Sequence, residues 1–322
     1  MKKETLSLLG PSGCGKSMTL KCIAGIEKPD EGKIILNNKV LFDSKKGINL
    51  PPQDRKVGLL FQSYALFPNM TLYENISIGI RGNIKKDNKV KEIIDRFSLN
   101  KLKNHYPHQL SGGEQQRVAL ARMIINEPEI FMLDEPFSAL DEYLRWNIIE
   151  WIAELMEREN TPTILVSHDK NEVYRLSDTV AIMKNGKIVE ENTKKNIFNN
   201  PSSVYSANLI GYKNISEIQF IDRDTLYVKD WNLNLNIDNY NKNARYIGIN
   251  QQNINLKLKG KNTFTFLVVD KIINYDHVML LLKNNEEQKR PIYMKVDNGN
   301  KFSINDRIRI SLDKENINLF NR

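Results

Sequence analysis

The stretch GPSGCGKS at residues 10–17 decides the fold class of this chain. Its glycines allow backbone conformations that other residues avoid, so successive amides can point inward at phosphate oxygens. An apolar run at 5–9 precedes it, and a helical pattern from about Gly15 to Ile26 follows, whose first amides favour an anion. Lys16 can reach the outer phosphates and Ser17 can offer an oxygen to Mg²⁺. The loop predicted to bind nucleotide phosphates comprises Gly10, Pro11, Ser12, Gly13, Cys14, Gly15, Lys16 and Ser17.

Apolar runs alternate with helical patterns through the first two-thirds of the chain. Two further buried-type runs lie at 129–134 and 161–169, and residues 179–191 have the pattern of a hairpin turning at Asn185-Gly186. Helical patterns occur at 89–97, 113–126 and 144–159. Continuous apolar strands that alternate with helices predict a parallel sheet covered on both faces.

The pattern of apolar and polar residues changes after residues 199–203, NNPSS. From about residue 213, short segments with period-2 alternation follow one another, separated by Asn, Asp and Gly. This pattern predicts an all-β domain, a small barrel or sandwich. We therefore expect two domains in the 322 residues, an α/β P-loop nucleotide-binding domain over 1–204 and a β domain over 205–322.

Composition limits the classes of partner and compartment. The formal net charge is +8, but no run of Lys and Arg typical of a nucleic-acid patch occurs, so we expect no nucleic-acid partner. Cys14 and Cys22 are the only cysteines, which indicates a reducing compartment. No apolar run approaches the roughly 18 residues of a spanning helix. The chain is predicted to be a globular protein without a membrane span of its own.

Two further motifs contain residues suited to catalysis or anion binding. In IFMLDEP, residues 130–136, an apolar run delivers Asp134 to the end of a strand, where it would hold Mg²⁺ through water, and Glu135 would polarise an attacking water. In LSGGEQQR, residues 110–117, Ser111 has an N-cap position and the two glycines expose amides at a helix start, which predicts a second anion site. Asp54 and Arg55 are expected to be loop charges.

With these motifs the chain resembles the ATP-binding subunits of ABC transporters over roughly residues 1–200. The resemblance implies a Walker A loop at 10–17, a helical subdomain at about 63–128 and a D-loop at 138–141. It implies that the signature Ser111, Gly112, Gly113 and Glu114, together with Asp141, bind the ATP held by an opposite subunit. It assigns catalysis to Glu135, His168, Gln62 and Lys16, with His168 of LVSHD as the switch histidine. It assigns Mg²⁺ to Ser17, Gln62 and Asp134.

The same resemblance implies partners and a place in the cell. Two ATP molecules would lie between two copies of the chain, which would form a homodimer. The dimer would serve two membrane-spanning permease subunits and an extracytoplasmic substrate-binding protein, and would lie at the cytoplasmic face of the membrane. The β domain would resemble an oligomer-binding barrel, with a regulatory role or a role as a dimerising scaffold.

The cargo is expected to be an oxyanion. FDSKKGINLPP at 42–52 and YSANLIGYKNISEI at 205–218 resemble the molybdate importer ATPases, so the chain would energise molybdate uptake. Importer ATPases for sulfate, a polyamine or ferric iron are the alternatives. Two other classes are a soluble ATPase acting on DNA or ribosomes and a binding protein without turnover.

The segment that precedes the loop is short. Relatives in the family carry a strand pair and an aromatic residue that stacks on adenine ahead of Walker A, whereas only residues 1–9 stand here, without an aromatic. We therefore expect the N-terminal strands to be truncated, through a misassigned start or a real deletion, and a truncated ATPase would bind nucleotide more weakly.

Overall fold

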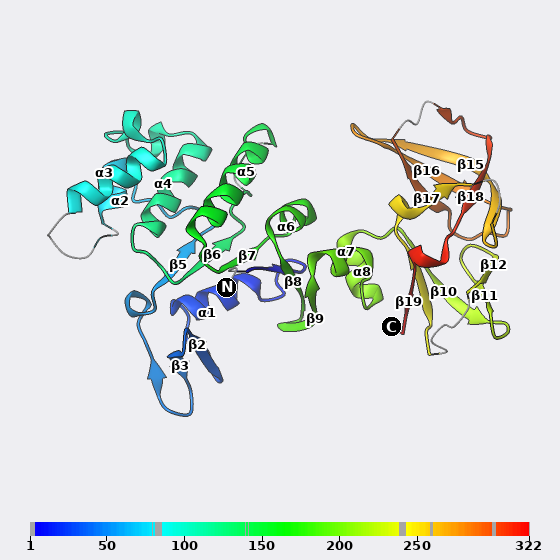
Figure 1. Ribbon diagram of the computed structural model, residues 1–322, viewed down its shortest axis with the longest axis horizontal. Coiled ribbons are helices and arrows are strands. Elements are labelled where there is room, and N and C mark those ends of the chain that lie inside the picture. The colour runs from blue at the N-terminus through cyan, green and yellow to red at the C-terminus, as the bar shows by residue number, and fades with distance from the viewer. Residues whose placement is uncertain are drawn as a thin grey trace. The chain divides into compact units, whose positions relative to one another are not determined.

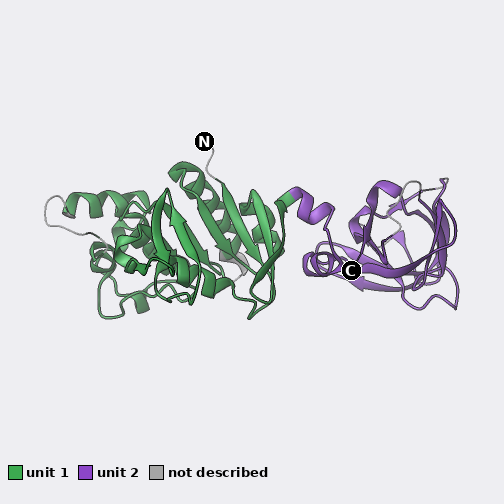
Figure 2. Ribbon diagram, turned by 90° about the horizontal axis from the view of Figure 1, so that it is seen from below, with its two compact units in different colours: residues 1–194 green, residues 195–322 purple. Residues whose placement is uncertain are grey.

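The computed structural model describes residues 4–78, 80, 86–138, 140, 142–237, 243–257, 260–297 and 301–321. The chain forms two compact units, residues 1–194 and 195–322 (Figure 2). The boundary expected at 204/205 falls at the first residue of helix α8, Val204–Ile210, and the whole of this helix belongs to the second unit.

The first unit is built on a six-stranded sheet in the order β5-β6-β7-β1-β8-β9 (Figure 1). Its strands are β1 Thr5–Leu9, β5 Val57–Leu60, β6 Ile130–Asp134, β7 Thr163–Val166, β8 Thr179–Lys184 and β9 Lys187–Thr193. All neighbours pair in parallel except β8 and β9, the hairpin predicted at 179–191. The predicted parallel sheet is confirmed.

Both faces of this sheet are covered, because alternate residues of each strand point to opposite sides. In β6, Phe131 and Leu133 pack in one core with the helices α2 Leu72–Ser77, α3 Lys86–Arg96, α4 Gly112–Ile124 and α5 Glu142–Glu159. Met132 points the other way and packs with Leu20 of helix α1, Lys16–Ala24. Helix α6, Lys170–Leu176, follows β7, and α2, α3 and α4 lie together as a group (Figure 1).

A small antiparallel sheet and three short 3-10 helices complete the first unit. The sheet consists of β2 Lys33–Leu36, β3 Lys39–Asp43 and β4 Ile48–Asn49. The 3-10 helices span Pro52–Asp54, Asn100–Leu102 and Pro107–Gln109.

Arg55 is not the loop charge expected from the sequence. It is 1% exposed, and its guanidinium donates hydrogen bonds to the carbonyl oxygens of Cys22 and Ile23 at 2.8 and 2.9 Å. These carbonyls lie in the last turn of helix α1, where carbonyls lack partners from a following turn, and Cys22 O also accepts from the Gly25 amide at 3.2 Å. Arg55 therefore caps the helix that follows the phosphate-loop motif, a structural role that buries its charge.

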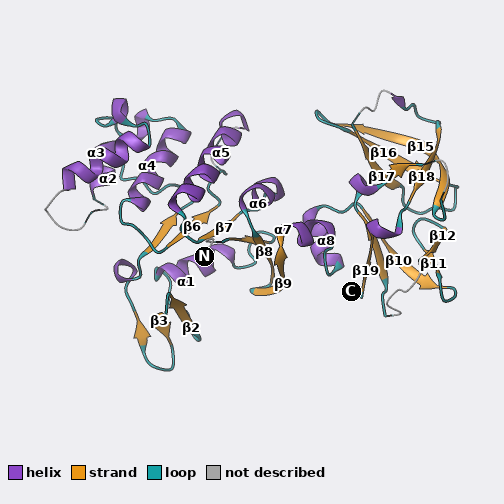
Figure 3. Ribbon diagram, viewed as in Figure 1, coloured by secondary structure: helices purple, strands orange, loops and turns teal. Residues whose placement is uncertain are grey.

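Helix α7, Lys194–Asn199, leads into the second unit, which then contains α8, strands and 3-10 helices at Gln251–Asn253 and Lys314–Asn316 (Figure 3). One five-stranded antiparallel sheet has the order β12-β11-β10-β13-β19 and the other β14-β18-β15-β16-β17. Their strands are β10 Asn214–Phe220, β11 Thr225–Val228, β12 Leu233–Asn236, β13 Tyr246–Ile249, β14 Asn255–Leu256, β15 Thr263–Ile273, β16 Val278–Lys283, β17 Ile292–Val296, β18 Arg307–Ser311 and β19 Ile317–Phe320. The two sheets share one core, which includes Trp231 and Phe266. The predicted β-rich domain is confirmed.

No helix in the described part of the chain is long and apolar enough to cross a membrane.

Candidate functional site

The phosphate-loop motif runs from the end of β1 into α1 and wraps around its own lysine. Lys16 is 5% exposed, and its Nζ donates hydrogen bonds to the carbonyl oxygens of Gly10 at 2.8 Å and Pro11 at 3.0 Å. Gly13 and Gly15 have φ angles of 78° and 106°, a region that side chains disfavour. The loop therefore presents amides and an ammonium group in one concave turn, the arrangement that suits phosphate oxygens.

Ser17 and Asp134 face each other at one edge of the sheet. Ser17 Oγ donates a hydrogen bond to Asp134 Oδ1 at 2.8 Å. Both residues line a cavity of about 410 Å³ together with Lys21, Phe61, Gln62, Ser63 and Ser138. Burial raises the pKa of the Asp134 carboxyl above its ordinary value, while the Ser17 hydrogen bond and nearby Lys21 and Lys16 oppose that rise.

The donor set fits a magnesium ion that arrives with its nucleotide. Among the described residues, no group of three or more His, Cys, Asp and Glu side chains is arranged to hold a metal. Ser17 and Asp134 supply two hard oxygens, and Mg²⁺ in nucleotide sites takes the rest of its ligands from phosphates and water. These two residues would therefore hold the ion only together with phosphates in the loop.

Glu135 lies close to two of the three other predicted catalytic side chains, Gln62 and His168. Gln62 Nε2 donates to Glu135 Oε2 at 3.2 Å, and His168 Nδ1 lies 3.5 Å from the same oxygen. Glu135 has a φ of 45°, a costly conformation for a residue with a Cβ, and its amide donates to Val166 O of β7 at 2.9 Å. This strained backbone conformation places the Glu135 carboxylate within reach of Gln62 and His168.

The signature residues form a separate site at the start of α4. Ser111 is the N-cap, its Oγ accepts from the Glu114 amide, and the Glu114 carboxylate accepts from the Ser111 amide at 2.8 Å. Gln115 Nε2 donates to Pro107 O and Leu110 O, which fixes the preceding turn. Within the described residues, none of these hydrogen bonds reaches the 10–17 loop. Asp141 lies outside the described residues.

Comparison with known proteins assigns the chain to a family. A family model for ABC transporter matches residues 1–138. The spermidine/putrescine import ATP-binding protein of Clostridioides difficile is 41% identical over 239 residues, 72% of this chain and 65% of that one. The probable sulfate/thiosulfate import ATP-binding protein of Chlorella vulgaris is 38% identical over 212 residues, 65% of this chain and 87% of that one. The chain belongs to the ABC transporter ATP-binding family.

A solved structure agrees with this ABC assignment. A dimeric ATP-binding cassette in a post-hydrolysis state, bound to ADP and Pi, is 30% identical, covers 60% of this chain and 87% of its own length, and has a TM-score of 0.51. The fold is thus an ABC ATPase cassette with a C-terminal β-rich domain. The chain spans 65% of the length of the C. difficile relative, just under two thirds.

Sequence reasoning missed a partly buried ion cluster beside His168 of this ABC cassette. Arg145 of α5 donates to Glu172 Oε1 through Nε at 2.8 Å and to Asp169 Oδ2 through Nη2 at 3.0 Å. Glu172 is 3% exposed and also accepts from Ser167 Oγ, so both residues flanking His168 are tied into the cluster. The signal available in the sequence was the charged residue Glu172, four positions after His168. Spacing alone does not distinguish such a residue from a charge on the surface.

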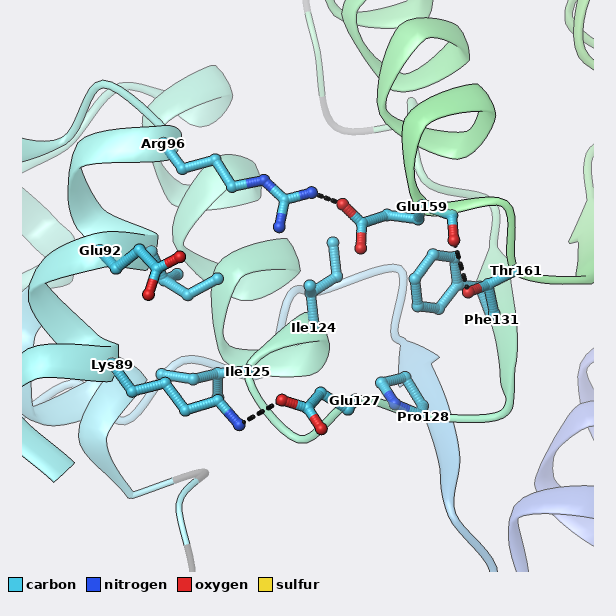
Figure 4. A pocket seen from close by; sticks show the side chains of 11 residues that line it. Lys89, Glu92, Arg96, Ile124, Ile125, Glu127, Pro128, Phe131, Glu159 and Thr161 are labelled. Atoms are coloured by element: carbon cyan, nitrogen blue, oxygen red, sulfur yellow. Dashed lines mark hydrogen bonds and ion pairs between the residues drawn. The ribbon is translucent and has the colours of Figure 1, made fainter. Parts of the chain in front are cut away.

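A second cavity of the cassette lies at the opposite end of β6 and contains none of the predicted site residues. It measures about 250 Å³, and side chains from α3, α4 and the end of α5 line it (Figure 4). Lys89 and Glu127 form an ion pair at 2.7 Å on one side, and Arg96 pairs with Glu159 on another. Both cationic side chains of the lining are thus paired with carboxylates, Glu92 is a third carboxylate in the lining, and we assign this cavity no chemistry.

Proposed function

We propose that this chain is the ATP-hydrolysing subunit of an ABC importer. The observation that carries the proposal is the Glu135 carboxylate, held 3.2 Å from Gln62 Nε2 and 3.5 Å from His168 Nδ1. A carboxylate next to a phosphate-binding loop can orient a water and accept its proton during phosphoryl transfer. Kinship with import ATP-binding proteins of two organisms supports the same reaction class.

Each residue of the site has a proposed part in hydrolysis. Lys16 exchanges its bonds to Gly10 O and Pro11 O for phosphate oxygens, and the amides of the loop bind the remaining oxygens. Ser17 and Asp134 hold Mg²⁺, which neutralises phosphate charge when it is bound. Glu135 takes a proton from the attacking water, Gln62 orients that water, and His168 donates a hydrogen bond to the terminal phosphate.

The second half of each ATP site comes from another copy of the chain in this proposal. Ser111 and Glu114 satisfy each other in a capping box, while Gly112 and Gly113 leave the first turn of α4 without side-chain bulk. Such a helix start is suited to a phosphate approaching from outside its own subunit. Two copies would thus enclose two ATP molecules as a homodimer, with Asp141 at the seam.

The remaining partners follow from the proposed role as an importer subunit. The dimer would bind two membrane-spanning permease subunits that receive cargo from an extracytoplasmic substrate-binding protein. It would therefore lie at the cytoplasmic face of the membrane as a peripheral subunit.

The cargo has two candidates. Molybdate is proposed from the segments at 42–52 and 205–218, which resemble those of molybdate importers. A polyamine is the second, because the C. difficile relative at 41% identity is named for spermidine and putrescine. Vesicles containing the complete transporter separate the two: ATP-driven uptake of labelled molybdate supports the first, and uptake of labelled spermidine the second.

Phosphate release by the purified full chain tests the reaction itself. With ATP and Mg²⁺ the parent protein is expected to turn over, and Glu135→Gln is expected to lose about 100-fold or more in kcat because the amide accepts no proton. Glu191→Gln, on an exposed position of β9, serves as the matched control and should keep parental turnover. Equal turnover of Glu135→Gln and the parent would refute the assignment of Glu135.

A further inference from the structure

Arg122 joins the signature helix to the turn that carries Gln62. The residue lies in the last turn of α4, and its guanidinium donates from Nη1 to Ala65 O at 2.8 Å and from Nη2 to Tyr64 O at 2.9 Å. The same guanidinium lies 5.5 Å from the centre of the Phe67 ring. One planar fork thus binds two consecutive carbonyls and rests on an aromatic ring of the same loop, a geometry that lysine cannot reproduce.

The turn held by Arg122 is strained. Tyr64 and Ala65 have φ angles of 58° and 46°, in the left-handed region that residues with a Cβ disfavour. Two hydrogen bonds tighten the turn further, from Tyr64 N to Phe61 O at 2.9 Å and from Ala65 N to Ser63 O at 2.7 Å. A conformation of this kind persists only where the surroundings determine it, and the Arg122 fork is one such determinant.

The strained turn contacts two adjacent residues that follow the end of β6, Glu135 and Pro136. Gln62, within the turn, donates to the Glu135 carboxylate. The Tyr64 ring is 4% exposed, and its hydroxyl donates to Pro136 O at 3.4 Å, at the residue directly after Glu135. Any relaxation of the turn would therefore move Gln62 relative to Glu135, while the 10–17 loop and its contacts would stay in place.

We infer that Arg122 is a positioning residue for hydrolysis, a role that rests on the proposed function. It holds the turn in the conformation that brings Gln62 to Glu135, and it is not among the residues that line the cavity at Ser17 and Asp134. Because Ser111 is the N-cap of α4, the fork also links the signature helix, through the turn, to the catalytic carboxylate of its own subunit. A movement of α4 would thus reach Glu135 through Arg122 and the turn.

The substitution Arg122→Lys in the full chain tests this link. The ammonium group keeps the charge but cannot bond both carbonyls in the same plane. We expect kcat for ATP hydrolysis to fall about 10- to 100-fold, the effect of a small misplacement at a catalytic group, with KM for ATP near the parental value. Backbone amides of residues 61–67 should exchange with deuterium faster than in the parent.

Arg175→Lys is the matched control, because the partner of the Arg175 guanidinium among the described residues is the exposed Glu150 carboxylate, at 2.9 Å. It should keep both the parental kcat and the parental exchange of residues 61–67. The variant Ala65→Gly separates positioning from general stability, since glycine adopts a positive φ at little cost. In an Ala65→Gly background, Arg122→Lys should lose less in kcat than it does alone.

Three results would overturn the inference: parental kcat in Arg122→Lys, unchanged exchange of residues 61–67, or losses in the double variant that simply multiply. A parent without ATPase activity, or Glu135→Gln with full turnover, would instead refute the proposed function, and the inference would fall with it. The two failures are therefore distinguishable in one set of assays.

Discussion

Ser17 Oγ donates a hydrogen bond to Asp134 Oδ1 at 2.8 Å, although the two residues stand 117 positions apart in the chain. The contact joins the start of α1 to the carboxyl end of β6, across a sheet in which β7 separates β1 from β6. It brings the phosphate loop and the acidic motif into one site. The partial burial of Asp134 that comes with it has a consequence for stability.

Asp134→Asn is expected to stabilise the nucleotide-free protein while it abolishes hydrolysis. Burial raises the pKa of the Asp134 carboxyl, so the fold prefers the protonated form, and at neutral pH the ionised carboxylate lowers the free energy of unfolding. Asparagine resembles the protonated acid, and its carbonyl can still accept from Ser17. Thermal unfolding as a function of pH measures the difference.

Because the pKa of Asp134 is raised in the folded protein, the stabilisation by Asp134→Asn depends on pH. The gain in midpoint temperature should be present above the raised pKa and should disappear as the pH falls below the ordinary value of 3.8, where both forms are neutral. Glu191→Gln, at an exposed position of β9, is the control for the exchange of a carboxylate for an amide. A variant less stable than the parent at neutral pH would contradict the proposed cost of the charge.

The sequence predicts this part of the candidate site because the motifs that indicate it are short and local. Glycines at fixed offsets predict the loop, and an apolar run ending in Asp134 and Glu135 predicts a strand end. Parallel strands bring such ends to one edge of a sheet. His168 lies near the end of the predicted run at 161–169, but its catalytic role was inferred only from the resemblance to the family.

The arginines could not be predicted, because their partners are carbonyls and carboxylates with no spacing signature. Arg55 binds Cys22 O, 33 positions away, and Arg122 binds Ala65 O, 57 positions away. The positive φ angles of Tyr64 and Ala65 were equally hidden, since neither residue type favours such a turn. Tertiary packing determines both the strain and the side chains that hold it.

Arg145→Met is expected to lower the free energy of unfolding by about 3 kcal/mol, the lower end of the cost of breaking a buried ion pair from one side. The Glu172 carboxyl is 3% exposed, and burial raises its pKa while Ser167 and Arg145 lower it. Without Arg145 the carboxylate is left buried beside Asp169. Urea unfolding of the purified chain measures the loss.

The double variant Arg145→Met/Glu172→Gln provides the internal control. Once the buried charge is removed together with its partner, most of the lost free energy of unfolding should return. Losses that add in the double variant would show that Arg145 and Glu172 do not depend on each other.

Gly25→Ala is expected to destabilise the protein more than Gly32→Ala. Both glycines have positive φ angles, 80° and 111°, so both substitutions incur a backbone cost of about 1 kcal/mol. A Cβ at Gly25 would lie 2.4 Å from Arg55 Nε, whereas a Cβ at Gly32 meets nothing within 4 Å. We expect the Gly25 variant to lose about 1–3 kcal/mol more, the usual cost of overpacking.

Urea unfolding of the two glycine variants isolates the role of the Arg55 cap, since they share the backbone cost. Equal losses would mean that Arg55 yields freely and that its bonds to the end of α1 contribute little to stability.

The central claim is that Glu135 drives hydrolysis in an ATP site completed by a second copy of the chain. Gel filtration of Glu135→Gln with and without ATP and Mg²⁺ tests it most directly, with light scattering to give the mass. The account predicts that the variant elutes as a stable dimer with ATP and as a monomer without nucleotide, because it binds ATP but cannot consume it. A variant that remains monomeric with ATP and Mg²⁺ would contradict the account.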